Sequence, residues 1–184
     1  YMVDAVHLGT LYDRIQLASI CGTKEDRCAL DWAGMIISKP VVTEVRGVPL
    51  VITPTFVPDG THPAGIVAVK VVMRDGEPRF EPYWQAPRFE TGDAIRRFRR
   101  HPSRIRLATY DGIEIAWVVE VNKGGKGQLL GVRVWDGAIV VDQELSGSGT
   151  RFTVPLVYED RVILSSCPSD FGPSWLEAYR VSLE

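Results

Sequence analysis

Short apolar runs of the same design recur along this 184-residue chain, and this repetition constrains its fold more than any other feature. Three of these runs can be set side by side: Gly65–Val72, Gln128–Trp135 and Ser174–Val181. Each follows a loop rich in Gly, Pro, Asp or Ser, and the first two lead through an Asp-Gly pair into another strand-like run. Self-similarity at a spacing of a few tens of residues is typical of repeat architectures. The chain therefore predicts several similar strand-rich units.

Two complete units can be read from the pattern of apolar runs and turn residues. Residues 39–87 predict an antiparallel meander of four strands, at Pro40–Val45, Val48–Val57, Gly65–Met73 and Phe80–Gln85. Residues 103–147 repeat the pattern with strands at Arg104–Tyr110, Ile113–Val121, Leu129–Trp135 and Ala138–Leu145. Arg46-Gly47 and the Asp-Gly pairs at 75–76, 111–112 and 136–137 predict the tight turns between strands. Both central residues of such a turn favour positive φ.

The two ends of the chain predict partial units, at residues 1–38 and 148–184. The last unit has three expected strands, at Phe152–Tyr158, Arg161–Ser166 and Trp175–Leu183. In the first unit we expect Val3–Gly9, Ile15–Ile20 and Cys28–Trp32. An alternative aligns Asp13–Ser19 with Asp160–Ser166, which shifts the strand numbering by one, and the sequence leaves both open. The chain begins at Tyr1 and not at Met, which indicates a processed, trimmed or fragmentary chain.

An arginine-rich insertion, residues 88–102, separates the two complete units. Thr91 or Asp93 could cap a short helix that ends near His101, before Pro102. Such a helix would place Arg96, Arg99 and Arg100 on one face. That face could bind carboxylates or phosphates through paired hydrogen bonds. The ordinary alternative is a solvated helix paired with acidic groups.

These units favour an all-β, propeller-like array of four-stranded antiparallel blades. One such sheet cannot bury both of its faces, but sheets repeated around an axis cover one another and leave only short edges exposed. Units of roughly 45 to 65 residues also match the spacing of kelch and WD40 repeats. A β-sandwich or barrel is the alternative. The tryptophans are expected to pack between blades, because each buries a large apolar area.

The pattern of strands and turn residues in these units resembles the blades of the quinoprotein (PQQ-like) propeller family. Trp175–Val181 resembles the third strand of such a blade, and Phe152–Ile163 resembles the first two. Pro40-Val41-Val42 fits the opening of a blade, and Trp32 and Trp84 resemble the packing Trp of the fourth strand. The chain departs from the pattern in its third unit, and the quinone-binding and calcium-binding signatures of the family are not recognisable. The resemblance implies a propeller segment from an extracytoplasmic protein, periplasmic or secreted.

No recognisable catalytic or metal-binding motif stands out in the sequence. His7, His62 and His101 lack ligand spacing, and Cys21, Cys28 and Cys167 form no C-x-x-C pair. A formal charge of −2 gives the whole chain no strong attraction to nucleic acid, and no apolar run reaches the roughly 18 residues of a membrane span. Asn122–Gly127 is expected to be a hairpin loop, since it lacks the spacing of a phosphate-binding loop.

The sequence therefore favours a non-catalytic scaffold or interaction module without a cofactor. We expect it to bind a protein partner through its loops and the basic insertion, at Arg96, Arg97, Arg99, Arg100 and the loop residue Phe171. Self-association that completes the propeller is the other expected partnership, because incomplete first and last units leave unpaired strand edges. A polyanion is a third partner to consider. The rival functions are a subunit or fragment of a quinoprotein-like oxidoreductase and a carbohydrate-binding module.

Overall fold

The computed structural model describes residues 2–3, 11–13, 39–56, 64–88, 98, 102–122, 125–150, 154–167 and 174–183. These residues form strands, turns and loops, and none of them lies in a helix. The chain is therefore all-β over this part, as the sequence predicts. No helix long and apolar enough to cross a membrane occurs among the same residues.

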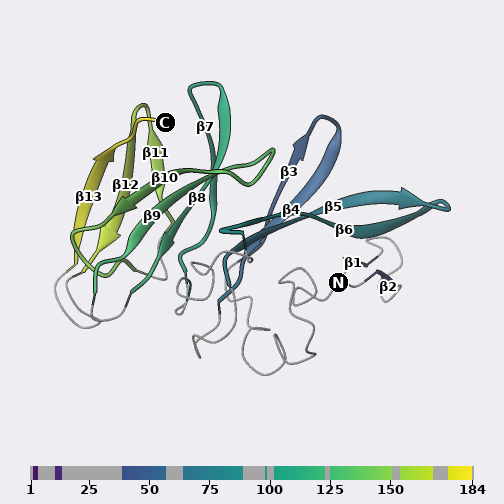
Figure 1. Cartoon of the computed structure of the whole chain (residues 1–184), viewed down its shortest axis with the longest axis horizontal. Coiled ribbons are helices and arrows are strands. Elements are labelled where there is room, and N and C mark those ends of the chain that lie inside the picture. The colour runs from purple at the N-terminus through teal and green to yellow at the C-terminus, as the bar shows by residue number, and fades with distance from the viewer. Residues whose placement is uncertain are drawn as a thin grey trace.

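Three antiparallel sheets follow one another along the chain (Figure 1). The first sheet contains β3 (Val41–Val45), β4 (Val48–Pro54), β5 (Ile66–Arg74) and β6 (Glu77–Ala86). The middle sheet contains β7 (Arg106–Tyr110), β8 (Ile113–Glu120), β9 (Gln128–Arg133) and β10 (Ile139–Glu144). The last sheet contains β11 (Leu156–Tyr158), β12 (Arg161–Ser166) and β13 (Trp175–Arg180). Within each sheet every strand pairs with the next one in sequence, which is the predicted meander.

A short pair of strands lies apart from these sheets, near the N-terminus. Strand β1 (Met2–Val3) pairs antiparallel with β2 (Leu11–Asp13), and β2 lies against β6 of the first sheet. The expected strand at Val3–Gly9 therefore has only its first residue in the described part, and Leu11–Asp13 was not expected as a strand. The expected strands at Ile15–Ile20 and Cys28–Trp32, and Trp32 itself, lie outside the described residues.

The middle sheet is buried on both faces. Its residues Ala116, Val118, Leu130 and Val132 pack with the first sheet, whereas Ile115, Trp117, Val119 and Leu129 pack with the last sheet. Successive side chains of a strand point to opposite faces, so an almost continuous apolar run such as Ile113–Val119 is what two-sided burial requires. Figure 1 shows the middle sheet between the other two.

The tight turns follow the sequence in three of four places. Arg46-Gly47, Asp75-Gly76 and Asp111-Gly112 all have positive φ at both residues, between 49° and 79°. The Asp136-Gly137 pair does not form the predicted two-residue hairpin. Strand β9 ends at Arg133 and β10 begins at Ile139, and of the pair only Gly137 has positive φ.

Other strand bounds also differ from the prediction. In the last sheet β11 begins only at Leu156, after Pro155, and β13 ends at Arg180 instead of Leu183. The expected packing role fits Trp84 and Trp117, which are buried, but it is wrong for two other tryptophans. Trp135 is 45% exposed and Trp175 is 41% exposed.

The predicted helical insertion is corrected at Phe98. This residue has φ of 53°, which a right-handed helix does not allow. Its side chain is fully buried in the core between the first and middle sheets, and its backbone N–H donates to Glu120 Oε1 at 2.7 Å. Phe98 is thus a buried core residue, and a right-handed helix does not run through this position of the insertion.

Candidate protein-binding surface

A β-bulge in β6 turns two aromatic side chains toward the middle sheet. Ala68 pairs with Trp84 and Val69 pairs with Pro82, so Tyr83 is an extra residue in β6. A bulge interrupts the alternation of side chains and re-aims them. The Tyr83 hydroxyl donates to the backbone carbonyl of Trp135 at 2.9 Å, and Trp84 Nε1 donates to that of Val134 at 2.7 Å. Consecutive aromatic residues of one sheet therefore hold consecutive carbonyls of the next.

The loop between β9 and β10 is built to accept these bonds. The Val134 N–H donates to the carbonyl of Glu114 at 3.0 Å, and the Gly137 N–H donates to that of Arg133 at 2.9 Å. A Cβ atom at Gly137 would lie 2.8–2.9 Å from atoms of the Trp84 ring, and φ is 74° there. Only glycine fits both the close approach and the left-handed backbone. The loop is therefore fixed against the first sheet.

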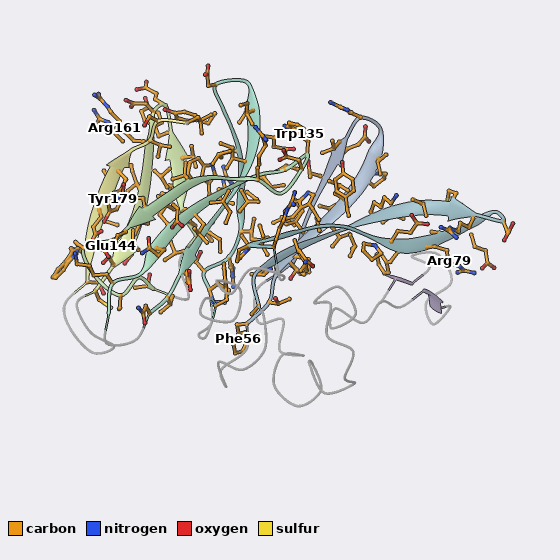
Figure 2. All side chains as sticks on the ribbon, in the orientation of Figure 1. Phe56, Arg79, Trp135, Glu144, Arg161 and Tyr179 are labelled. Carbon is orange, nitrogen blue, oxygen red and sulfur yellow. The ribbon has the colours of Figure 1, made fainter. Side chains whose placement is uncertain are left out.

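This loop and the first sheet together present an exposed aromatic surface with two guanidinium groups. Trp135 is 45% exposed and Tyr83 is 42% exposed. The guanidinium carbon of Arg133 lies 4.5 Å from the centre of the Trp135 ring, and that of Arg46 lies 5.8 Å from it. We call Arg46, Tyr83, Arg133, Trp135 and Asp136 the Trp135 surface. Figure 2 shows Trp135 where a loop of the middle sheet extends toward β3.

The two arginines of the Trp135 surface differ in their charge balance. Arg133 Nε donates to Asp136 Oδ1 at 2.9 Å, and Nη2 donates to Oδ2. This pairing lowers the pKa of Asp136, and it raises the pKa of Arg133. Arg46 stands in the turn between β3 and β4, is exposed, and forms no ion pair within the described part of the chain. It is the cation that an incoming carboxylate can use.

The chemistry of this surface suits binding more than catalysis. Asp136 is held ionised by Arg133, so it is a poor proton acceptor at neutral pH. Tyr, Trp and Arg are the residue types that contribute most to protein–protein binding energies. The described residues contain no group of three or more His, Cys, Asp or Glu side chains that could hold a metal ion.

A hollow also lies on the middle sheet. It is a polar cavity of about 250 Å³ lined by Glu120, Asn122, Lys126, Gln128 and Asp142. Lys126 Nζ lies 2.6 Å from Glu144 Oε1. Two carboxylates and one lysine line this cavity, the lysine pairs with Glu144 outside the lining, and none of the lining residues is aromatic. We therefore place the candidate surface at Trp135.

The site residues expected from sequence are not among those that the structure describes. Arg96, Arg97, Arg99, Arg100 and Phe171 all fall outside the described residues, as do the three histidines. Arg88, Arg104 and Arg106, which flank the insertion, are described and exposed. The sequence does not reveal the Trp135 surface, because Trp135 ends an apolar run and this pattern predicts a packing residue. The useful signal was its place beside Asp136-Gly137, since loop residues carry function more often than core residues do.

Comparison of this chain with protein-family models, with curated proteins and with solved structures finds no match.

Proposed function

We propose that this chain is a non-catalytic, propeller-type scaffold that binds an acidic segment of a protein partner at the Trp135 surface. The blade assignment is supported by three successive antiparallel meanders, stacked so that the middle one is buried on both faces. Such sheets position loops rigidly at their ends. The basic insertion, with Arg96, Arg97, Arg99 and Arg100, remains part of the proposed partner-binding region, together with Phe171.

The observation that carries the proposal is the arrangement of Trp135, Tyr83 and Arg46 around one exposed spot. Two half-exposed rings offer apolar contact area, and the Tyr83 hydroxyl and the backbone of Trp135 are already fixed by hydrogen bonding to each other. Fixed aromatic side chains lose little conformational entropy on binding. In the partner segment, an Asp or Glu carboxylate would pair with Arg46, and an adjacent aromatic or aliphatic side chain would pack on the rings of Tyr83 and Trp135.

A protein segment fits this surface better than a nucleic acid does. Affinity for a polyanion grows with the number of phosphates that basic side chains neutralise. Here Arg133 is already neutralised by Asp136, whereas Arg46 has no ion pair with any residue that the structure describes. One available guanidinium beside two rings suits one or two carboxylates.

The test is an array of immobilised peptides in which one Phe or Leu is flanked by varying numbers of Asp and Glu residues. We expect the labelled protein to prefer acidic peptides, and the Trp135→Ala and Arg46→Ala variants each to lose about tenfold in affinity, which is about 1.4 kcal/mol at a binding hot spot. Tyr158→Ala and Arg74→Ala are matched controls, since both residues are exposed and lie away from the surface. Equal binding by wild type and Trp135→Ala would contradict the proposal, and binding of single-stranded oligonucleotides in place of acidic peptides would replace it.

A further inference from the structure

The Trp135 surface is assembled from two sheets, and its two halves are held in different ways. Trp135 lies in the loop that the Tyr83 hydroxyl and Trp84 Nε1 hold from β6. Arg46 lies in the turn between β3 and β4, and β3 is at the opposite edge of the first sheet from β6. The hydrogen bonds from β6 therefore do not fix Arg46. Its guanidinium carbon lies 5.8 Å from the centre of the Trp135 ring, close to the limit of about 6 Å for a cation–π interaction.

The end of the β3–β4 hairpin extends beyond the rest of the first sheet. Strand β4 pairs with β3 from Val48 onward, but its pairing with β5 begins only at Leu50. The rows between Leu50 and the turn therefore contain two strands in the described part of the chain. Figure 1 shows this turn pointing away from the turn between β5 and β6. Val45 and Val48 pack on the core, but apolar packing is non-directional, and two strands alone are only marginally stable.

Thr43 supplies a directional contact at the base of this hairpin end. It pairs with Leu50, so it stands in the last row of three strands before the turn. Its Oγ1 lies 3.0 Å from each carboxylate oxygen of Glu114, the second residue of β8, and its hydroxyl donates to that carboxylate. A hydrogen bond to an ionised acceptor is stronger than one between neutral groups. This bond therefore holds the hairpin end against the middle sheet.

Glu114 also holds the other half of the Trp135 surface. Its backbone carbonyl accepts the Val134 N–H at 3.0 Å, and Val134 is the residue before Trp135. Through its side chain, the same residue contacts the strand that leads to Arg46. One residue of β8 thus connects the cation of this surface to its aromatic loop.

We propose that Thr43 and Glu114 are positioning residues that hold Arg46 beside Trp135, and that they thereby set the preference of the Trp135 surface for carboxylate-bearing segments. This inference rests on the proposed function. Without the Thr43 hydrogen bond, a partner carboxylate has to order the turn when it pairs with Arg46, which costs binding free energy. Apolar contact with Tyr83 and Trp135 is unaffected, because the hydrogen bond between these two residues does not involve the hairpin. The positioning residues therefore control selectivity more than overall affinity.

The first experiment compares two peptides that differ only in charge, one with Asp and Glu around a central Phe and one with Asn and Gln in their place. Wild type should bind the acidic peptide about tenfold more tightly, which matches the loss expected for Arg46→Ala. Thr43→Val keeps the shape and the charge but removes the hydroxyl. It should reduce the preference to about threefold, while the neutral peptide binds as before. A general loss of folding would instead weaken the binding of both peptides.

Two variants serve as controls for Thr43→Val. Thr43→Ser retains a hydroxyl and should restore the preference for the acidic peptide. Thr109→Val is the matched control, since Thr109 is exposed and pairs with Glu114 across β7 and β8. It should leave the preference unchanged. The charge of Glu114 is the same in every variant, so a change in preference cannot come from that charge.

The second experiment measures the position of Arg46 by NMR and needs no peptide. The ring current of Trp135 shifts the signals of nearby protons, so the δ-methylene signals of Arg46 should move toward their random-coil values in Thr43→Val. Those of Arg133, whose guanidinium carbon lies 4.5 Å from the ring, should not move. Unchanged Arg46 signals, or an acidic preference that survives Thr43→Val, would overturn the inference. Equal binding of both peptides by wild type would overturn the proposed function and the selectivity role with it, while the Arg46 signals still test the positioning.

Discussion

The hydrogen bonds to Glu177 lead to a prediction about acid stability. Four donors of three residues converge on this half-buried carboxylate: the backbone and hydroxyl of Ser146, the Tyr179 hydroxyl and the Trp175 indole. Burial alone would raise the pKa of Glu177, but these hydrogen bonds outweigh it and lower the pKa from 4.5 to about 2. Replacing Glu177 by Gln should therefore destabilise the fold at neutral pH.

The magnitude follows from the link between pKa and stability. A fall from 4.5 to about 2 corresponds to a ceiling of about 3 kcal/mol. The carboxylate still contacts water, which screens the interaction, so we expect Glu177→Gln to cost about 1–2 kcal/mol. Because the folded-state pKa lies below the unfolded value, the stabilisation is complete above pH 4.5 and is lost as the pH falls toward 2.

The assay is urea unfolding of wild type and Glu177→Gln at neutral pH and at several values down to about pH 2.5. The difference in free energy of unfolding should shrink as the pH falls, because other carboxylates titrate equally in both proteins and cancel. Glu144→Gln is the control. Its pair with Lys126 is exposed on both sides, at 54% and 58%, and should contribute no more than about 0.5 kcal/mol. A Glu177→Gln difference that is below about 0.5 kcal/mol, or that does not change with pH, would refute the reasoning.

Two further predictions test how the first and middle sheets are joined, both by urea unfolding. Gly137→Ala should cost about 2–4 kcal/mol, since its Cβ would meet the Trp84 ring, whereas Gly76→Ala, with similar φ and nothing within 4 Å, should cost about 1 kcal/mol. Equal losses of unfolding free energy for Gly137→Ala and Gly76→Ala would contradict this prediction, because they would show that the Trp84 ring moves to accommodate the new Cβ. Trp84→Phe should cost about 1–2 kcal/mol more than Trp117→Phe, because it orphans the Val134 carbonyl. Trp117 is fully buried, but its Nε1 has no acceptor among the described residues, so the reverse order would contradict this account.

The strand order and three of the four tight turns could be predicted from sequence because both depend on local chemistry. Positive φ at two successive residues favours an Asp-Gly or similar pair wherever two strands must reverse tightly. Asp136-Gly137 has the same local signal but a different outcome. Val134 is held by the carbonyl of Glu114 and by Trp84 Nε1, so the chain leaves β9 before the Asp-Gly pair is reached. Tertiary hydrogen bonds overrode the turn.

The faces of the strands could be predicted only in part. The continuous apolar run of β8 indicates burial on two sides, and the structure buries it on two sides. The burial of single tryptophans could not be read in the same way. Trp117 and Trp135 both stand in apolar runs, yet one lies in the centre of the middle sheet and the other in a loop beyond its edge. Sheet packing decides between them, and it depends on residues far away in the sequence.

The two departures from regular strand geometry at the Trp135 surface depend on each other. In a regular strand without the bulge, the side chains of Tyr83 and Trp84 would point to opposite faces of the sheet. Only one of them could then reach the middle sheet. Without the longer β9–β10 loop, the carbonyls of Val134 and Trp135 would not be available to both donors. Either the bulge or the longer loop alone would interrupt the hydrogen bonds between paired strands without forming both hydrogen bonds between the sheets. Their coincidence at one place joins the first and middle sheets and leaves the rings of Tyr83 and Trp135 partly exposed, as the proposed binding surface requires.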